Sequence, residues 1–107
     1  MRGIVVVRGG GDLATGTILR LHQCGFSVLA LECARPTAIR RQVALCEAVY
    51  DDAVQVEGVT CRRIEAHQQA YEVWQAGEIP LLVDESGECL AQIRPLALVD
   101  AILAKRN

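Results

Sequence analysis

The stretch VVVRGGGDLATG, residues 5–16, most constrains the fold, because an apolar run leads into consecutive glycines and then into residues that favour a helix. Ile4 to Val7, a run ended by Arg8, is typical of a buried central strand of a parallel sheet. Asp12 is a good N-cap, and Gly25 stands where a left-handed helix C-cap is expected. A second apolar run closed by an acid follows, so residues 4–32 predict a β-α-β unit with a right-handed crossover.

The remaining pattern repeats this alternation of strand and helix. Residues 65–76 predict a helix that ends at Gly77, and residues 79–83 predict a strand. Residues 96–103 are apolar on all sides, and Pro95 before them favours a buried strand over a helix. The fold class predicted for residues 1–107 is therefore α/β: a single three-layer, Rossmann-like domain with a mostly parallel sheet. Less distinct parts of the pattern are a buried helix face of Leu13, Ala14, Thr17, Ile18 and Leu21, candidate strands at 43–45 and 54–61, and turn residues Asp51 and Asp52.

Composition narrows the classes of partner. The net charge of −2 gives no field that would attract a nucleic-acid backbone, and no stretch approaches the roughly 20 apolar residues of a membrane span. The start of the chain also lacks the core of a signal peptide, so we expect a cytoplasmic protein. Five cysteines without a C-x-x-C pair match neither a disulfide framework nor a zinc site, and we expect no metal site.

The glycine turn fits a dinucleotide-binding fingerprint. In Gly9-x-Gly11-x-x-Ala14, the first glycine permits a sharp turn, the second admits a pyrophosphate, and the small third residue lets helix and strand pack closely. Glu32 follows Gly11 by 21 positions, at the end of the second predicted strand, where a carboxylate would bind a ribose hydroxyl. The candidate cofactor-binding residues in this part of the chain are Gly9, Gly10, Gly11, Asp12, Ala14 and Glu32.

Other readings of the same turn remain open. The P-loop pattern fails because its lysine is absent, whereas a purely structural turn between strand and helix is as plausible as a phosphate cradle. Asp12 would compete with a phosphate for the helix N-terminus and would repel it. Arg35, Arg40 and Arg41 act in the opposite sense, because they would bind a phosphate or another anion, and their alternative is a solvated basic face.

Several other side chains could carry chemistry. Cys24 is expected on the buried side of the first helix, and Cys46 and Cys61 are expected to be structural. Cys33 follows Glu32 at the carboxyl end of a strand and is the cysteine with most functional potential. Asp84 and Asp100 could be turn residues or strand-end acids with a catalytic role. His22 and His67 are expected to be surface histidines on helices, and no catalytic residue is assigned.

The chain resembles the amino-terminal part of the YqeB family, accessory proteins of selenium-dependent molybdenum hydroxylases. The resemblance covers nearly all 107 residues. It rests on VRGGGDLATG, GFSVLALECARPTAIRRQVALCEAVY, VQVEGVTCRRI, IPLLVDESGECL and LALVDAILAKRN, in that order. The first strand and turn are also similar to the Rossmann domain of XdhC-type proteins, which serve xanthine dehydrogenase maturation. The residue that matches Asp12 there is usually histidine.

The resemblance implies a maturation factor for a molybdenum hydroxylase, which would be its partner. It also implies that the chain is the amino-terminal fragment of a longer protein, with any site completed by a second half missing. The candidate cofactors are NAD(P) and a molybdenum-cofactor nucleotide. Two alternatives stay open, namely the NAD(P)-binding part of an oxidoreductase and a non-catalytic docking scaffold. A partial sheet would expose a strand edge, which we expect a second copy of the chain to cover.

Overall fold

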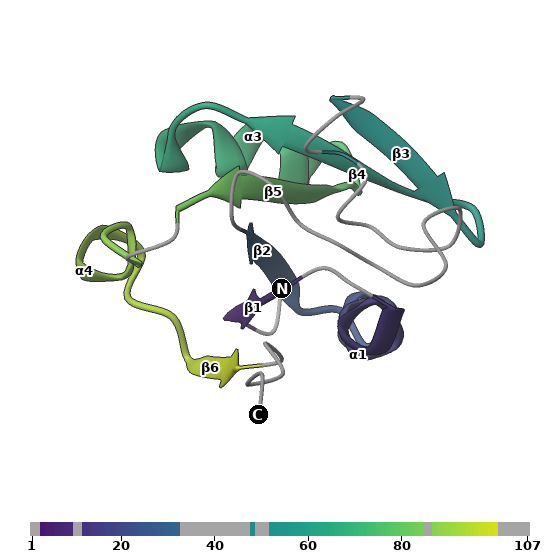
Figure 1. The fold of residues 1–107 in the computed structure, drawn as a ribbon, viewed down its shortest axis with the longest axis horizontal. Helices are drawn as coiled ribbons and strands as arrows, with labels where there is room; N and C mark the ends of the chain where they lie inside the picture. The colour runs from purple at the N-terminus through teal and green to yellow at the C-terminus, as the bar shows by residue number, and fades with distance from the viewer. Residues whose placement is uncertain (1–2, 10–11, 33–47, 49–51, 85–86, 101–107) are drawn as a thin grey trace, which may run out of the picture.

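The computed structural model describes residues 3–9, 12–32, 48, 52–84 and 87–100. Its described strands form one six-stranded sheet in the order β3-β4-β5-β2-β1-β6 (Figure 1). All neighbouring strands are parallel except the pair β3 and β4, so the α/β class with a mostly parallel sheet is confirmed. The strands are β1 (Ile4–Arg8), β2 (Ser27–Glu32), β3 (Ala53–Val56), β4 (Val59–Ile64), β5 (Ile79–Val83) and β6 (Ala97–Asp100), and the helices are α1 (Asp12–Gln23), η3 (His67–Gln69, a 3-10 turn), α3 (Ala70–Gln75) and α4 (Leu90–Ile93).

The predicted β-α-β unit is present as β1, α1 and β2. Helix α1 ends as the sequence indicates, because Gly25 takes a φ of 93° and donates its N–H to the carbonyl of His22 at 3.0 Å. The next amide, that of Phe26, reaches back to Leu21 at 3.2 Å, which completes a Schellman motif. The buried face of α1 agrees with the prediction in part. Ala14 and Ile18 are buried as expected, whereas Thr17 is exposed and Thr15 and Leu19 are buried.

Side chains of the central strands alternate between two apolar layers. Val5 and Val7 pack with α1 on one face of the sheet, whereas Val6 between them packs with α3 and α4 on the other. Figure 1 shows α1 and α4 on opposite sides of β1 and β2. This placement follows from right-handed crossovers, because the connection from β1 to β2 and the one from β5 to β6 run across the sheet in opposite directions.

The middle of the chain corrects two predictions. The candidate strand at 54–61 is two antiparallel strands, because Glu57 and Gly58 take φ values of 52° and 81° and reverse the chain. The predicted helix at 65–76 begins late, since Ala66 is extended with a φ of −145°, and only η3 and α3 are helical. Residues 43–45 and Asp51 lie outside the described residues.

The last described strand also differs from the prediction. Strand β6 was expected to be buried, but it stands at the end of the strand order and pairs with β1 alone in the described sheet. Leu96 is therefore 70% exposed and Leu98 47% exposed. Across the described ranges, none of the helices has the length and apolar character needed to cross a membrane.

Candidate functional site at the carboxyl edge of the sheet

The strand order reverses between β1 and β6. From β1 the chain moves to β2 on one side, whereas from β5 it crosses β2 and β1 to reach β6 on the other side. In open α/β sheets, ligands bind in the crevice that such a reversal leaves at the carboxyl ends of the strands. The carboxyl ends of β1, β2 and β6, at Arg8, Glu32 and Asp100, therefore define the candidate site.

The glycine turn starts at this edge. Gly9 is buried and takes a φ of 102°, a conformation in which a side chain would be strained. Its N–H donates to the carbonyl of Leu31 on β2 at 2.6 Å, so the first residue of the turn is still tied to the sheet. Ala14, the small third position of the fingerprint, is 3% exposed and packs in the apolar layer with Val5 and Val7. The close packing of helix on strand that the fingerprint requires is thus present.

Glu32 closes β2 beside this turn. The register pairs Arg8 with Leu31, so Glu32 and Gly9 follow at neighbouring positions of adjacent strands. Glu32 is only 9% exposed, and its carbonyl accepts the N–H of Asp84 at 3.1 Å, which fixes the end of β2 against the end of β5. A carboxylate held here has the position of the acid that binds a ribose hydroxyl in dinucleotide sites.

Arg8 and Asp100 bridge the strand reversal. They are register partners on β1 and β6, and Nη1 of Arg8 lies 3.5 Å from Oδ2 of Asp100. Both side chains reach solvent, at 34% and 55% exposure, so this ion pair is accessible at the carboxyl edge of the sheet. Sequence reasoning gave Arg8 no role beyond ending the strand. An arginine between an apolar run and a glycine turn was the available signal.

Asp84 is a structural acid in the loop after β5. Its Oδ1 accepts the N–H groups of Gly87 and Glu88 at 3.0 and 3.1 Å, and its Oδ2 accepts that of Cys89 at 2.9 Å. Burial alone would raise the pKa of Asp84, but these hydrogen bonds outweigh it and hold the pKa below its ordinary value. The carboxylate organises the loop before α4, as a turn-forming acid does.

Among the described cysteines, the burial of Cys24 differs from the prediction. Cys24 lies exposed just after α1, whereas it was expected to be buried. Cys61 and Cys89 are buried, as structural cysteines are. Burial, and next the hydrogen bond and charge of Asp84, raise the pKa of Cys89 to about 12, so this thiol is protonated at neutral pH.

The structure thus brings together three of the predicted site residues, Gly9, Ala14 and Glu32, and adds Arg8 beside them. Asp12 begins α1 directly after the turn. Gly10, Gly11, Arg35, Arg40 and Arg41 lie outside the described residues, as does Cys33. In the described ranges no group of three or more histidine, cysteine or acidic side chains could hold a metal ion. The described groups place a cation, Arg8, and a carboxylate, Glu32, at the same edge of the sheet.

Comparison with known proteins gives one strong similarity. The chain is 46% identical over 104 residues to "Uncharacterized protein YqeB" of Escherichia coli strain K12. The matched segment covers 97% of this chain but 19% of that relative, so the chain spans about a fifth of the curated protein's length. No family model matches, and no solved structure matches. The near-complete coverage of the chain at this level of identity supports its membership of the YqeB family.

Proposed function

We propose that this chain is the Rossmann-like, nucleotide- or cofactor-binding part of an accessory protein that matures a selenium-dependent molybdenum hydroxylase. The observation that carries the binding role is the junction of Gly9 and Glu32 at the carboxyl ends of adjacent strands, next to the strand reversal. The strand order β5-β2-β1-β6 supports the finer fold assignment, because it matches the order 3-2-1-4 of the dinucleotide-binding fold. The maturation role rests on the resemblance to the YqeB family and on no feature of the site.

The proposed ligand lies along the carboxyl edge of the sheet in a defined direction. Its phosphate part lies on the turn that starts at Gly9, with Arg8 as the nearest described cation, and its ribose lies against Glu32 on β2. NAD(P) and a molybdenum-cofactor nucleotide both contain these two parts. The partner that would receive or donate the cofactor is the hydroxylase.

The binding role is tested by calorimetric titration of the chain with NAD, NADP and cytidine nucleotides. We expect saturable binding that is weakened about tenfold in Glu32→Gln, because a ribose hydroxyl loses a charged acceptor there. Gly11→Val should abolish binding by keeping the pyrophosphate away from the backbone. The matched control is Glu72→Gln, the same change at an exposed position on α3, which should bind as the unmodified chain does.

The outcomes separate the competing functions. Preference for a cytidine nucleotide supports handling of a molybdenum cofactor, and co-purification of a selenium-dependent molybdenum hydroxylase with the chain supports the maturation role. Preference for NAD or NADP, together with hydride transfer by the full-length protein, would instead establish an oxidoreductase. Absence of binding at millimolar nucleotide would contradict the proposed site and leave a docking scaffold.

A further inference from the structure

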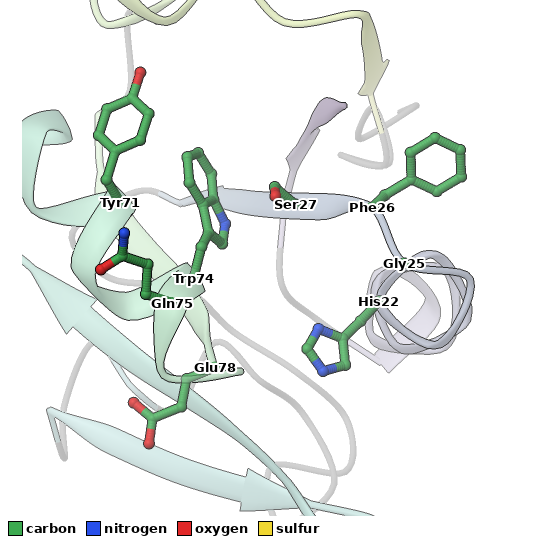
Figure 2. A pocket seen from close by; sticks show the side chains of 8 residues that line it. All are labelled: His22, Gly25, Phe26, Ser27, Tyr71, Trp74, Gln75 and Glu78. Atoms are coloured by element: carbon green, nitrogen blue, oxygen red, sulfur yellow. The ribbon is translucent and has the colours of Figure 1, made fainter. Parts of the chain in front are cut away.

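A pocket lies at the opposite end of the sheet from the candidate site. It has a volume of about 290 Å³. One side is formed by the end of α1 and the start of β2, and the other side by the end of α3 (Figure 2). Ser27 lines this pocket and Glu32 belongs to the carboxyl-edge site, so the length of β2, roughly 17 Å at 3.3 Å per residue, separates the two. The proposed nucleotide site does not use this pocket. The residues that line the pocket are His22, Gly25, Phe26, Ser27, Tyr71, Trp74, Gln75 and Glu78.

The aromatic wall of the pocket is held rigidly. Nε1 of Trp74 donates a hydrogen bond to the carbonyl of Val28 at 2.8 Å. Val28 precedes Ala30, the first residue of β2 that pairs with β5. The indole therefore satisfies a carbonyl at the open end of the ladder and is fixed in orientation. Tyr71 packs edge-on against it, with ring centroids 5.2 Å apart at 89°. Tyr71 is also 47% exposed, a large aromatic surface left at the rim.

The rest of the rim offers hydrogen-bond acceptors. Both flanking helices turn their carboxyl ends toward the pocket, since Gly25, just after α1, and Gln75, the last residue of α3, both line it. Glu78 closes the end of α3 by donating its N–H to the carbonyl of Val73 at 3.0 Å. Helix carboxyl ends carry partial negative charge. The Glu78 carboxylate adds acceptor oxygens, although Arg62 neutralises its charge through bonds of 2.8 and 3.3 Å. The Glu78 carboxylate and the side-chain amide oxygen of Gln75, which also lines the pocket, are acceptors for N–H groups.

Size and shape restrict the ligand further. A dry cavity of about 150 Å³ holds one benzene ring. At about 290 Å³ this pocket has room for two fused rings. Trp74 and Tyr71 offer flat stacking surfaces, and Figure 2 shows the His22 ring on the other side of the opening.

From this combination we infer that the pocket between α1 and α3 binds a planar, uncharged nitrogen heterocycle bearing amino groups. The ring stacks on Trp74 beside Tyr71, and its N–H groups face the helix carboxyl ends, Gln75 and Glu78. Two independent features carry the inference, an indole fixed in orientation and a rim of acceptors.

The test uses adenine as the probe and Trp74, the single tryptophan of the chain, as the reporter. We expect saturable quenching of its fluorescence by adenine, and amide NMR signals of Gly25, Ser27 and Gln75 that shift with the same concentration dependence. Gln75→Arg places a cation among the acceptors and should weaken binding by about tenfold. Gln68→Arg is the matched control, because Gln68 is exposed on η3 and does not line the pocket, and it should leave binding unchanged.

Each other outcome overturns the inference. Unchanged fluorescence at millimolar adenine would exclude the pocket as a heterocycle site. Equal weakening by both arginine variants would show a nonspecific charge effect. Shifts at Gly9 and Glu32 in place of those at Gly25 and Ser27 would mean that adenine binds at the carboxyl edge, and this result would support the proposed nucleotide site while refuting the second one.

Discussion

At the scale of single residues, Asp84 gives the clearest link between structure and stability. Its carboxylate accepts three backbone N–H groups before α4. We expect Asp84→Ala to lower the free energy of unfolding at neutral pH by about 1–2 kcal/mol, the range of a lost helix cap. Urea denaturation measures this difference, and Glu88→Ala, an exposed acid of the same loop, is the control with little effect.

The pH dependence of this difference follows from the lowered pKa of Asp84. A carboxyl group whose pKa is lowered on folding stabilises the folded state fully above its unfolded pKa, and the contribution disappears as the pH falls through the folded pKa. The difference between Asp84→Ala and the unmodified chain should therefore be constant well above pH 3.8, the ordinary value, and should shrink below it. A difference that is the same at acidic and neutral pH would contradict a stabilising role of the charged carboxylate.

The cysteines give a second prediction at this scale. Cys24 is exposed, whereas Cys89 is buried and its pKa is raised to about 12. Because the thiolate is the reactive form, we expect alkylation of Cys24 at neutral pH to be at least about tenfold faster than that of Cys89. Peptide mass spectrometry after a short pulse of iodoacetamide measures both rates. In urea, where the chain is unfolded, both cysteines should be alkylated equally fast. Equal alkylation rates of Cys24 and Cys89 in the native chain would refute the buried placement of Cys89.

Residue-level patterns in the sequence predicted part of the candidate site. Gly9 and Glu32 were found because their spacing is local to one β-α-β unit. The pairing of Arg8 with Asp100 was not, since 92 positions separate them and only the strand order makes them neighbours. Asp84 was left open for the same kind of reason, because its role depends on which amides the loop turns toward it.

At the scale of elements, the hairpin of β3 and β4 has an unusual turn. Glu57 takes a φ of 52°, a left-handed conformation that favours asparagine or glycine, and Gly58 follows with 81°. We expect Glu57→Asn to raise the free energy of unfolding by about 0.5–1 kcal/mol, because asparagine adopts this conformation at lower cost. Thermal or urea denaturation provides the measurement.

Gly58→Ala is the matched variant for the hairpin. An added Cβ at Gly58 would meet no atom within 4 Å, so its effect reports the backbone alone. We expect a loss of about 1–2 kcal/mol. If both changes left the stability unchanged, the turn would not have the left-handed geometry.

Elements defined by local signals were predicted best. The C-terminal ends of α1 and α3 followed from Gly25 and Gly77, and β1, β2 and β5 followed from apolar runs next to glycine or acids. The hairpin was read as one strand because Glu57 is not a typical turn residue. The start of α3 was placed too early because the side chain of Gln69 accepts the N–H groups of Glu65 and Ala66 at 2.6 and 3.0 Å, which holds these residues outside the helix.

At the scale of the whole molecule, strand order decides what is exposed. The run at 96–103 is as apolar as a central strand, yet β6 lies at the end of the described sheet. Burial is a property of the neighbours that the topology supplies, and one apolar run does not reveal whether a strand is central or terminal. The sequence thus predicted the α/β class but gave the wrong burial for β6.

An apolar strand at the end of a sheet is prone to pair with another strand, so the predicted self-association has its physical basis in β6. Leu98 is 47% exposed on this strand, opposite the fully buried Val6 in register. We expect concentration-dependent dimers in which β6 pairs with β6 of a second copy, and we expect Leu98→Lys to shift the chain to monomers, because lysines facing each other across the dimer axis repel. Sedimentation equilibrium measures the association.

Tyr71→Lys, at an equally exposed position on α3, is the control that should dimerise normally. Monomers of the unmodified chain at every concentration would refute pairing through β6, and dimers that survive in Leu98→Lys but not in Tyr71→Lys would place the interface on α3.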